Sequence, residues 1–177
     1  ELNKDRTNLK VVKNKCQINF DEEPKRPFQI NRIKVSNEKG ELENTFSIKE
    51  KIFVHFDFIA GKHVIDLMVN LSIFNNGQLL LTTNINDHDN KYSFRIKKGR
   101  YRAVIVIPSL TLKAGNYQLR GEMGISNFLG NVFKTEKGIQ IKIHDKIDGL
   151  ASNTTFTTRA GQILFPVKWE IDFKELV

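Results

Sequence analysis

The side chains of this sequence best suited to chemistry are polar residues at alternate positions of apolar segments. They supply hydrogen-bond donors and acceptors, with an aromatic ring beside them. This combination suits binding of sugar hydroxyls, with the ring beneath the apolar face of a sugar. The candidate carbohydrate-binding residues fall on four segments: Asp66, Asn70 and Phe74 on one, Gln118, Arg120 and Glu122 on a second, His55 and Asp57 (with Phe53 as a further platform) on a third, and Arg102 on a fourth.

Other chemistry finds little support in the residue pattern. Cys16 lies in a polar N-terminal stretch, and no Gly-x-Ser-x-Gly motif is present, so we expect no catalytic residue. Paired carboxylates that meet only in space stay an open alternative. The best metal candidate is the loop 86–90, but it lacks the central Gly and the spaced acidic ligands of an EF-hand loop. The four histidines show no zinc-ligand spacing, so we expect neither a metal nor another cofactor.

Composition limits the class of protein. The 177 residues carry a net charge of +8, which would suit nucleic acid, anionic lipid or an acidic glycan. The positive charge is spread along the chain, however, and its one dense patch (Lys97, Lys98, Arg100 and Arg102) is typical of a solvated turn, so we expect no nucleic-acid partner. The single cysteine allows no internal disulfide and fits a reducing compartment. No run of about 18 apolar residues is present, so we expect no transmembrane helix.

The elements that must position these side chains are β-strands. Residues 1–26 are polar and end in a stretch rich in proline and charge, which predicts an N-terminal tail or linker. From 27 to 177 we expect one domain, in which apolar and polar residues alternate as they do in half-buried strands. Asn76-Gly77 lies between two such segments and predicts a hairpin. The predicted strands are 28–35, 46–59, 65–73, 78–83, 101–107, 116–125, 139–143 and 163–171.

About eight short strands without a helical period predict an all-β fold, an antiparallel β-sandwich of the immunoglobulin-like or jelly-roll type. In an immunoglobulin-like arrangement 65–73 and 116–125 share one sheet, while 46–59 and 101–107 share the other. The candidate residues then lie on two competing faces, and the sequence does not choose between them. Trp169 is in phase with Val167 and Ile171, which predicts core packing for this ring.

One segment and its surroundings resemble a known family. Pro108, Leu110, Leu112, Gly115 and Tyr117 form the end of a strand, a Gly turn and a tyrosine that enters the next strand, as in a tyrosine corner. The Asn-Gly hairpin precedes this segment, the run 128–131 follows it, and 161–169 closes the chain. This order resembles the C-terminal domain of Wzt proteins, the ATP-binding subunits of ABC transporters that export O-antigen and related lipid-linked glycans. The resemblance covers about residues 28–171.

The resemblance implies a cytoplasmic β-sandwich, at the inner face of the cell membrane, that recognises a finished polysaccharide for export. It implies as partners the polysaccharide, the transporter membrane subunit and a nucleotide-binding domain, with residues 1–26 as the linker from that domain. It also implies a homodimer, in which the last strand can be exchanged. No Gly-x-x-x-x-Gly-Lys-Ser/Thr loop is present in these residues, so we assign no ATP chemistry to them. The alternative is a β-sandwich protein-interaction or assembly module that binds no glycan.

Overall fold

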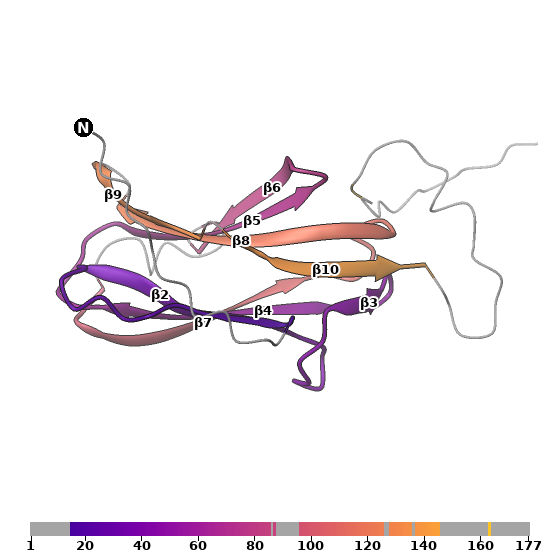
Figure 1. Cartoon of the computed structure of the whole chain (residues 1–177), viewed down its shortest axis with the longest axis horizontal. Coiled ribbons are helices and arrows are strands. Elements are labelled where there is room, and N and C mark those ends of the chain that lie inside the picture. The colour runs from indigo at the N-terminus through magenta and orange to yellow at the C-terminus, as the bar shows by residue number, and fades with distance from the viewer. Residues whose placement is uncertain are drawn as a thin grey trace, which may run out of the picture.

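The chain forms two packed β-sheets, as the computed structural model in Figure 1 shows. The structure describes residues 15–85, 87, 96–125, 128–135, 137–145 and 163. The predicted strand at 163–171 (apart from Ile163), Trp169 and all of the loop 86–90 except Asp87 lie outside these residues. The strands are β1 (Gln17–Asn19), β2 (Phe28–Ser36), β3 (Thr45–Ser47), β4 (Ile52–Ala60), β5 (Leu67–Asn75), β6 (Gln78–Asn84), β7 (Gly99–Ile107), β8 (Gly115–Ile125), β9 (Phe128–Lys134) and β10 (Ile139–His144).

One sheet has the strand order β1-β2-β4-β7, and the other has the order β3-β10-β8-β5-β6, with β9 paired to β8. Figure 1 shows these sheets as two layers, with β5, β8 and β10 in one and β2, β4 and β7 in the other. Neighbouring strands are antiparallel except β3 and β10. The predicted all-β sandwich is therefore confirmed. The described residues contain ten strands rather than about eight, because the short strands β1, β3 and β9 add to the predicted set.

The predicted strand 46–59 is wrong in one respect, because a turn divides it. The backbone N–H of Glu50 donates to the carbonyl of Ser47 at 3.0 Å, and the Ser47 N–H donates to the Glu50 carboxylate at 2.5 Å. β3 pairs with β10 in one sheet, whereas β4 pairs with β2 and β7 in the other. The turn thus carries the chain from one layer to the other, which an unbroken strand could not do.

The next predicted strand also begins later than expected. Asp66 has a φ of 56°, in the left-handed region, so regular alternation starts only at Leu67. Ile65 is consequently 53% exposed instead of facing the core. The hairpin after this strand is confirmed: Asn76 and Gly77 both have positive φ, 48° and 81°, as the two central residues of a type I′ turn require.

Alternation in the strands builds the core between the sheets. The buried positions on β4 are Ile52, Val54, Phe56, Phe58 and Ala60, and those on β5 are Leu67, Val69, Leu71 and Ile73. The expected tyrosine corner is confirmed, since the buried Tyr117 donates its hydroxyl hydrogen to the carbonyl of Lys113 at 2.9 Å. Tyr101 repeats this arrangement with the carbonyl of Lys97 at 2.7 Å. Both corners fix how a strand enters its sheet.

The N-terminal segment contributes to the sandwich from Cys16 onward. Cys16 is buried, and β1 pairs with β2. The Phe20 ring contacts the Phe133 ring edge-on at 5.6 Å between centroids. Within the described residues, no helix is long and apolar enough to cross a membrane.

Candidate functional site

The structure places the candidate residues on the outer faces of the two opposite sheets. β5 pairs with β8, so Asn70 lies opposite Glu122 and Phe74 lies opposite Gln118. β4 pairs with β7, so Asp57 lies opposite Arg102. The two pairs of strands thus belong to different sheets, and the two sets of candidates cannot contact one ligand on a single face.

On the β5–β8 face the central feature is a stack of Arg120 on Phe74. The guanidinium carbon of Arg120 lies 4.5 Å from the centre of the Phe74 ring, and its Nε donates to the Gln118 side-chain oxygen at 2.8 Å. A guanidinium over an aromatic ring is a favourable cation–π contact. It also covers that side of the ring, so Phe74 is not a bare platform for a sugar on that side.

The remaining polar groups of the β5–β8 face are bonded across strands. The Asn84 amide nitrogen donates to the Asn70 side-chain oxygen at 2.6 Å, and Lys134 lies 3.4 Å from the Glu122 carboxylate. Asp66 has no cross-strand partner in the β5–β8 register, because that register starts at Leu67. The described part of this face therefore holds a polar layer whose members largely satisfy one another.

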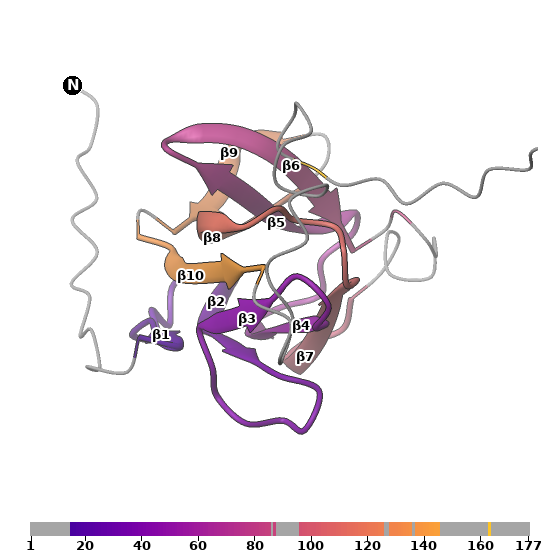
Figure 2. The same ribbon diagram turned by 90° about the vertical axis from the view of Figure 1, so that its right-hand side faces the viewer.

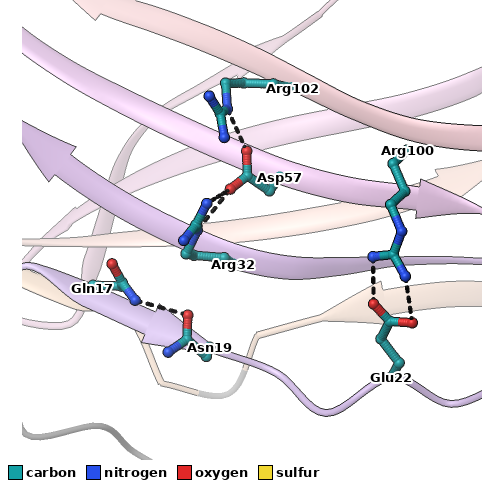
Figure 3. A network of polar contacts seen from close by, with 7 residues as sticks. All are labelled: Gln17, Asn19, Glu22, Arg32, Asp57, Arg100 and Arg102. Atoms are coloured by element: carbon teal, nitrogen blue, oxygen red, sulfur yellow. Dashed lines mark hydrogen bonds and ion pairs between the residues drawn. The ribbon is translucent and has the colours of Figure 1, made fainter.

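On the β4–β7 face, Asp57 lies between two arginines from the neighbouring strands (Figure 3). Arg32 donates from both Nε, at 2.7 Å, and Nη2 to one carboxylate oxygen, and Arg102 donates from Nε to the other at 2.7 Å. Burial alone would raise the pKa of Asp57, but the hydrogen bonds from Arg102 and Arg32 outweigh it and hold this pKa below its ordinary value. Asp57 therefore stays ionised at neutral pH and fixes both guanidinium groups.

His55 lies next to this cluster on the same face. Its Nε2 is 2.9 Å from the Ser36 hydroxyl, while its buried Nδ1 has no hydrogen-bond partner among the described residues. Burial lowers the pKa of His55, and the positive charges of Lys34 and Arg102 lower it further. His55 is therefore neutral at physiological pH and adds no charge to the face.

A cavity opens beside Asp57 at a bulge in β2. The pairing of β2 with β4 shifts between Ile30 and Arg32, and Asn31 is the extra residue. Both polar atoms of the Asn31 amide are buried and have no hydrogen-bond partner in the described part of the chain. A cavity of about 340 Å³, here called the Asn31 pocket, is lined by Asn31, Asp57, Phe58, Arg100, Tyr101 and Arg102.

The orphaned amide makes this pocket a candidate binding site. A buried polar group without a partner costs about 1–3 kcal/mol. The Asn31 amide offers both a donor and an acceptor, the combination that a hydroxyl group can satisfy from either side. Arg102 uses only Nε for Asp57, and its two Nη nitrogens make no hydrogen bond to a described residue. Asn31 and Arg102 thus line the same cavity, and because the Asn31 amide atoms are themselves buried, a ligand contacts them only if the Asn31 side chain turns toward the cavity.

The N-terminal segment is bonded through Glu22 to Arg100, a residue that lines the pocket. The Glu22 carboxylate accepts two hydrogen bonds from Arg100, at 2.5 and 3.0 Å, and these bonds lower the pKa of Glu22 (Figure 3). The segment is held in place by the buried Gln29, which accepts from the Glu23 N–H at 2.9 Å and donates to the Asp21 carbonyl at 3.2 Å. Arg100 is therefore tied to the segment that precedes β2.

Sequence reasoning selected Asp57, Arg102 and His55 on this face but missed Asn31, Arg32 and Arg100. The charge pattern places Arg100 in a solvated basic patch. The sequence does carry one signal for the bulge. Ile30 and Ile33 are apolar residues three positions apart, whereas strict alternation would place them an even number apart, and the structure buries both. Asn31 lies within this interval, and no pattern indicates that its amide would be buried.

The described residues contain no group of three or more His, Cys, Asp and Glu side chains that could hold a metal ion. Asp87, from the loop proposed as a metal candidate, accepts hydrogen bonds from the Thr83 hydroxyl at 2.7 Å and the Asn84 N–H at 2.8 Å. The rest of that loop lies outside the described residues.

Comparison with known proteins finds similarity of structure alone. No family model matches the sequence, and no curated protein matches it. The crystal structure of the C-terminal domain of Wzt superimposes with a TM-score of 0.61 over 84% of this chain and 86% of that one, at 9% sequence identity. A CARDB domain from Pyrococcus furiosus, solved in solution, has a TM-score of 0.36 over 67% of this chain and 96% of that one, at 12% identity. The chain thus has a Wzt-like fold.

Proposed function

We propose that this chain is a non-catalytic domain that recognises a cell-surface polysaccharide, O-antigen-like and lipid-linked, for export by an ABC transporter. The Asn31 pocket is the proposed glycan site. The observation that carries this assignment is the buried Asn31 amide, which has no partner among the described residues, at a pocket that the guanidinium group of Arg102 also lines. The Wzt-like fold supports the transporter context.

The size and chemistry of the pocket favour a single sugar unit. About 340 Å³ is near the lower end of the range for small-molecule sites. Neighbouring sugar hydroxyls donate and accept hydrogen bonds, which matches the amide of Asn31 and the donors of Arg102. Filling both positions would remove the cost of the unpaired amide, so binding gains from groups that the free protein leaves unsatisfied.

The same geometry argues for binding rather than hydrolysis. Among the described residues that line the pocket, Asp57 is the only one with a carboxylate, and both of its oxygens accept from arginines. Its lowered pKa makes it a poor general acid. Glycoside hydrolysis ordinarily needs two carboxyl groups flanking the bond. Asp57 instead orients the arginines that would contact the ligand.

In the proposed role the chain lies in the cytoplasm, at the inner face of the cell membrane. Its partners there are the polysaccharide, the membrane subunit of the transporter and a nucleotide-binding domain. The part of residues 1–26 that precedes Cys16 would link it to that nucleotide-binding domain, since the chain belongs to the sandwich from Cys16 onward. The ion pair between Glu22 and Arg100 then lies between the linker and the glycan site.

The test is a titration of the full chain with the surface polysaccharide of its own organism and with a foreign one. We expect binding of the first, reduced at least about tenfold by Asn31→Ala, since this removes a paired buried amide from the complex. Arg120→Ala, on the opposite sheet, is the control and leaves the affinity unchanged. A loss of binding with Arg120→Ala alone would place the site on the β5–β8 face, and failure of both glycans would exclude the carbohydrate function.

A second candidate function, protein interaction, is favoured by an apolar cleft of about 620 Å³ between β6 and β7. These are the end strands of their sheets among the described strands. Val104 and Val106 are 48% and 45% exposed beside the cleft. Exposed apolar clusters of this kind are typical of protein interfaces. Light scattering tests the expected homodimer, and Val104→Lys with Val106→Lys should convert such a dimer to monomers.

A further inference from the structure

A third cavity, of about 620 Å³, lies on a different side of the sandwich, between β1 and β10. Figure 2 shows β1 beneath the start of β10, with β3 beside the other end of β10. The residues that line it come from β1, β3, β8, β10 and the chain next to them, and include Lys15, Lys137 and Lys142. This cavity, here called the lysine pocket, shares no lining residue with the Asn31 pocket or with the apolar cleft.

The lysine pocket lies at an unpaired stretch of strand edge. The Lys142 N–H donates to the Asn44 carbonyl at 2.7 Å, which shows that the backbone N–H of Lys142 points toward the β3 side of β10. Strand geometry turns the N–H of Gln140, two residues earlier, to the same side. The register of β3 with β10 begins only at Lys142, so no described strand receives this N–H. An edge donor therefore opens into the pocket.

The charged side chains among the described residues that line the pocket are all positive, and Glu43, next to Asn44, lies outside this lining. None of the three lysines forms an ion pair within the described part of the chain, and no carboxylate is among the lining residues. The side-chain amides of Asn44 and Asn116 add further donors, while that of Gln17 already donates to the Asn19 side-chain oxygen at 2.9 Å. Like charges held together without a counter-charge repel one another, so an anion in the pocket would be stabilised.

We propose that the lysine pocket binds a phosphate group, either free or in the headgroup of an anionic membrane phospholipid. A phosphate has several acceptor oxygens, enough to contact more than one ammonium group and the Gln140 N–H together. The apolar floor of the pocket, Ile18, Ile139 and Ile141, is already buried against the core. The headgroup, and not an acyl chain, is therefore the part of a lipid that the pocket accommodates. The site does not depend on the glycan function.

The first experiment titrates the full chain with inorganic phosphate and follows backbone amide chemical shifts. We expect the Gln140 amide to shift in a saturable manner with phosphate and to remain in place with sodium chloride at equal ionic strength. A second arm measures co-sedimentation with vesicles of phosphatidylglycerol or of phosphatidylcholine. Binding to the anionic vesicles identifies a lipid headgroup as a source, while saturation by free phosphate without vesicle binding restricts the site to soluble phosphates.

The variant Lys137→Gln/Lys142→Gln tests the assignment against a general effect of charge. Its control, Lys39→Gln/Lys62→Gln, removes the same charge from exposed lysines that do not line the pocket. We expect the pocket variant to lose about fivefold in affinity for each lysine removed, and the control to bind phosphate as the wild type does. Equal losses in the two variants, or no shift of Gln140 with phosphate, would overturn the proposal. Matching melting temperatures show that both variants are folded.

Discussion

Asp57→Asn is the most informative single change, because it removes one charge from between two guanidinium groups while it keeps the shape of the side chain. A hydrogen bond to a charged group contributes about 1.5–3 kcal/mol, whereas an exposed ion pair contributes less than about 1 kcal/mol. Asp57 is 18% exposed and Arg32 is 36% exposed, which places this cluster between the two cases. We expect Asp57→Asn to lower the free energy of unfolding by about 2 kcal/mol, or about 4–8 °C in melting temperature.

The stability difference between wild type and Asp57→Asn should also depend on pH, in a direction set by the pKa of Asp57. The pKa of Asp57 is lowered in the folded chain, so the carboxylate stabilises the fold fully above its unfolded pKa of about 3.9. This stabilisation is lost as the pH falls through the lower pKa of the folded state. Urea unfolding of wild type and Asp57→Asn at pH 7, 5 and 3 measures it. The difference in stability should be equal at pH 7 and 5 and smaller at pH 3.

Glu38→Gln provides the matched control, since Glu38 pairs with Lys51 at 3.0 Å while the two side chains are 68% and 50% exposed. We expect a change in stability near zero for this variant. The reasoning is refuted if Asp57→Asn is as stable as wild type at pH 7. It is refuted equally if the stability difference does not change between pH 7 and pH 3, since the lost interaction would then not depend on the carboxylate charge.

Three further changes test the core and the site. Gly121→Ala puts a Cβ 2.5 Å from the Phe56 ring, and urea unfolding should show a loss of about 1–3 kcal/mol that Phe56→Leu in the same chain partly restores. Tyr117→Phe removes the hydrogen bond to the Lys113 carbonyl, and the same assay should show a loss of about 1 kcal/mol, with no loss arguing against the corner as a stabilising contact. Asn31→Ala should leave the melting temperature unchanged or raised, because the amide has no partner, and a clear drop would reveal a structural role.

Much of the fold was predictable because hydrophobic alternation is a local property. On β5 the phase of Leu67, Val69, Leu71 and Ile73 matches the buried face, and the Asn-Gly dipeptide places the hairpin that follows. The two errors arose where a turn lies within or beside an alternating pattern. Phe46 and Ile48 are in phase with Ile52 and Val54 although a turn at Ser47 to Glu50 separates them, and the left-handed Asp66 interrupts an alternation that looks unbroken in the sequence.

The candidate site was less predictable, because its members come from strands that meet only in the folded sheet. Arg32, Asp57 and Arg102 lie on three strands, and their register brings them side by side. Alternation could nominate Asp57 and Arg102 as facing outward, but it carries no information on which strands pair. The pairing also decided that these residues and Arg120 lie on different sheets.

The sequence by itself determined the strand periods, the hairpin, the tyrosine corner and hence an all-β sandwich with polar outer faces. Each of these follows from side chains a few residues apart, whose burial depends on local geometry. Only the tertiary structure decided that a bulge buries the Asn31 amide without a partner and opens a cavity beside Arg102. Whether a polar group is buried depends on everything packed around it. For that reason the sequence alone did not indicate Asn31 as a site residue.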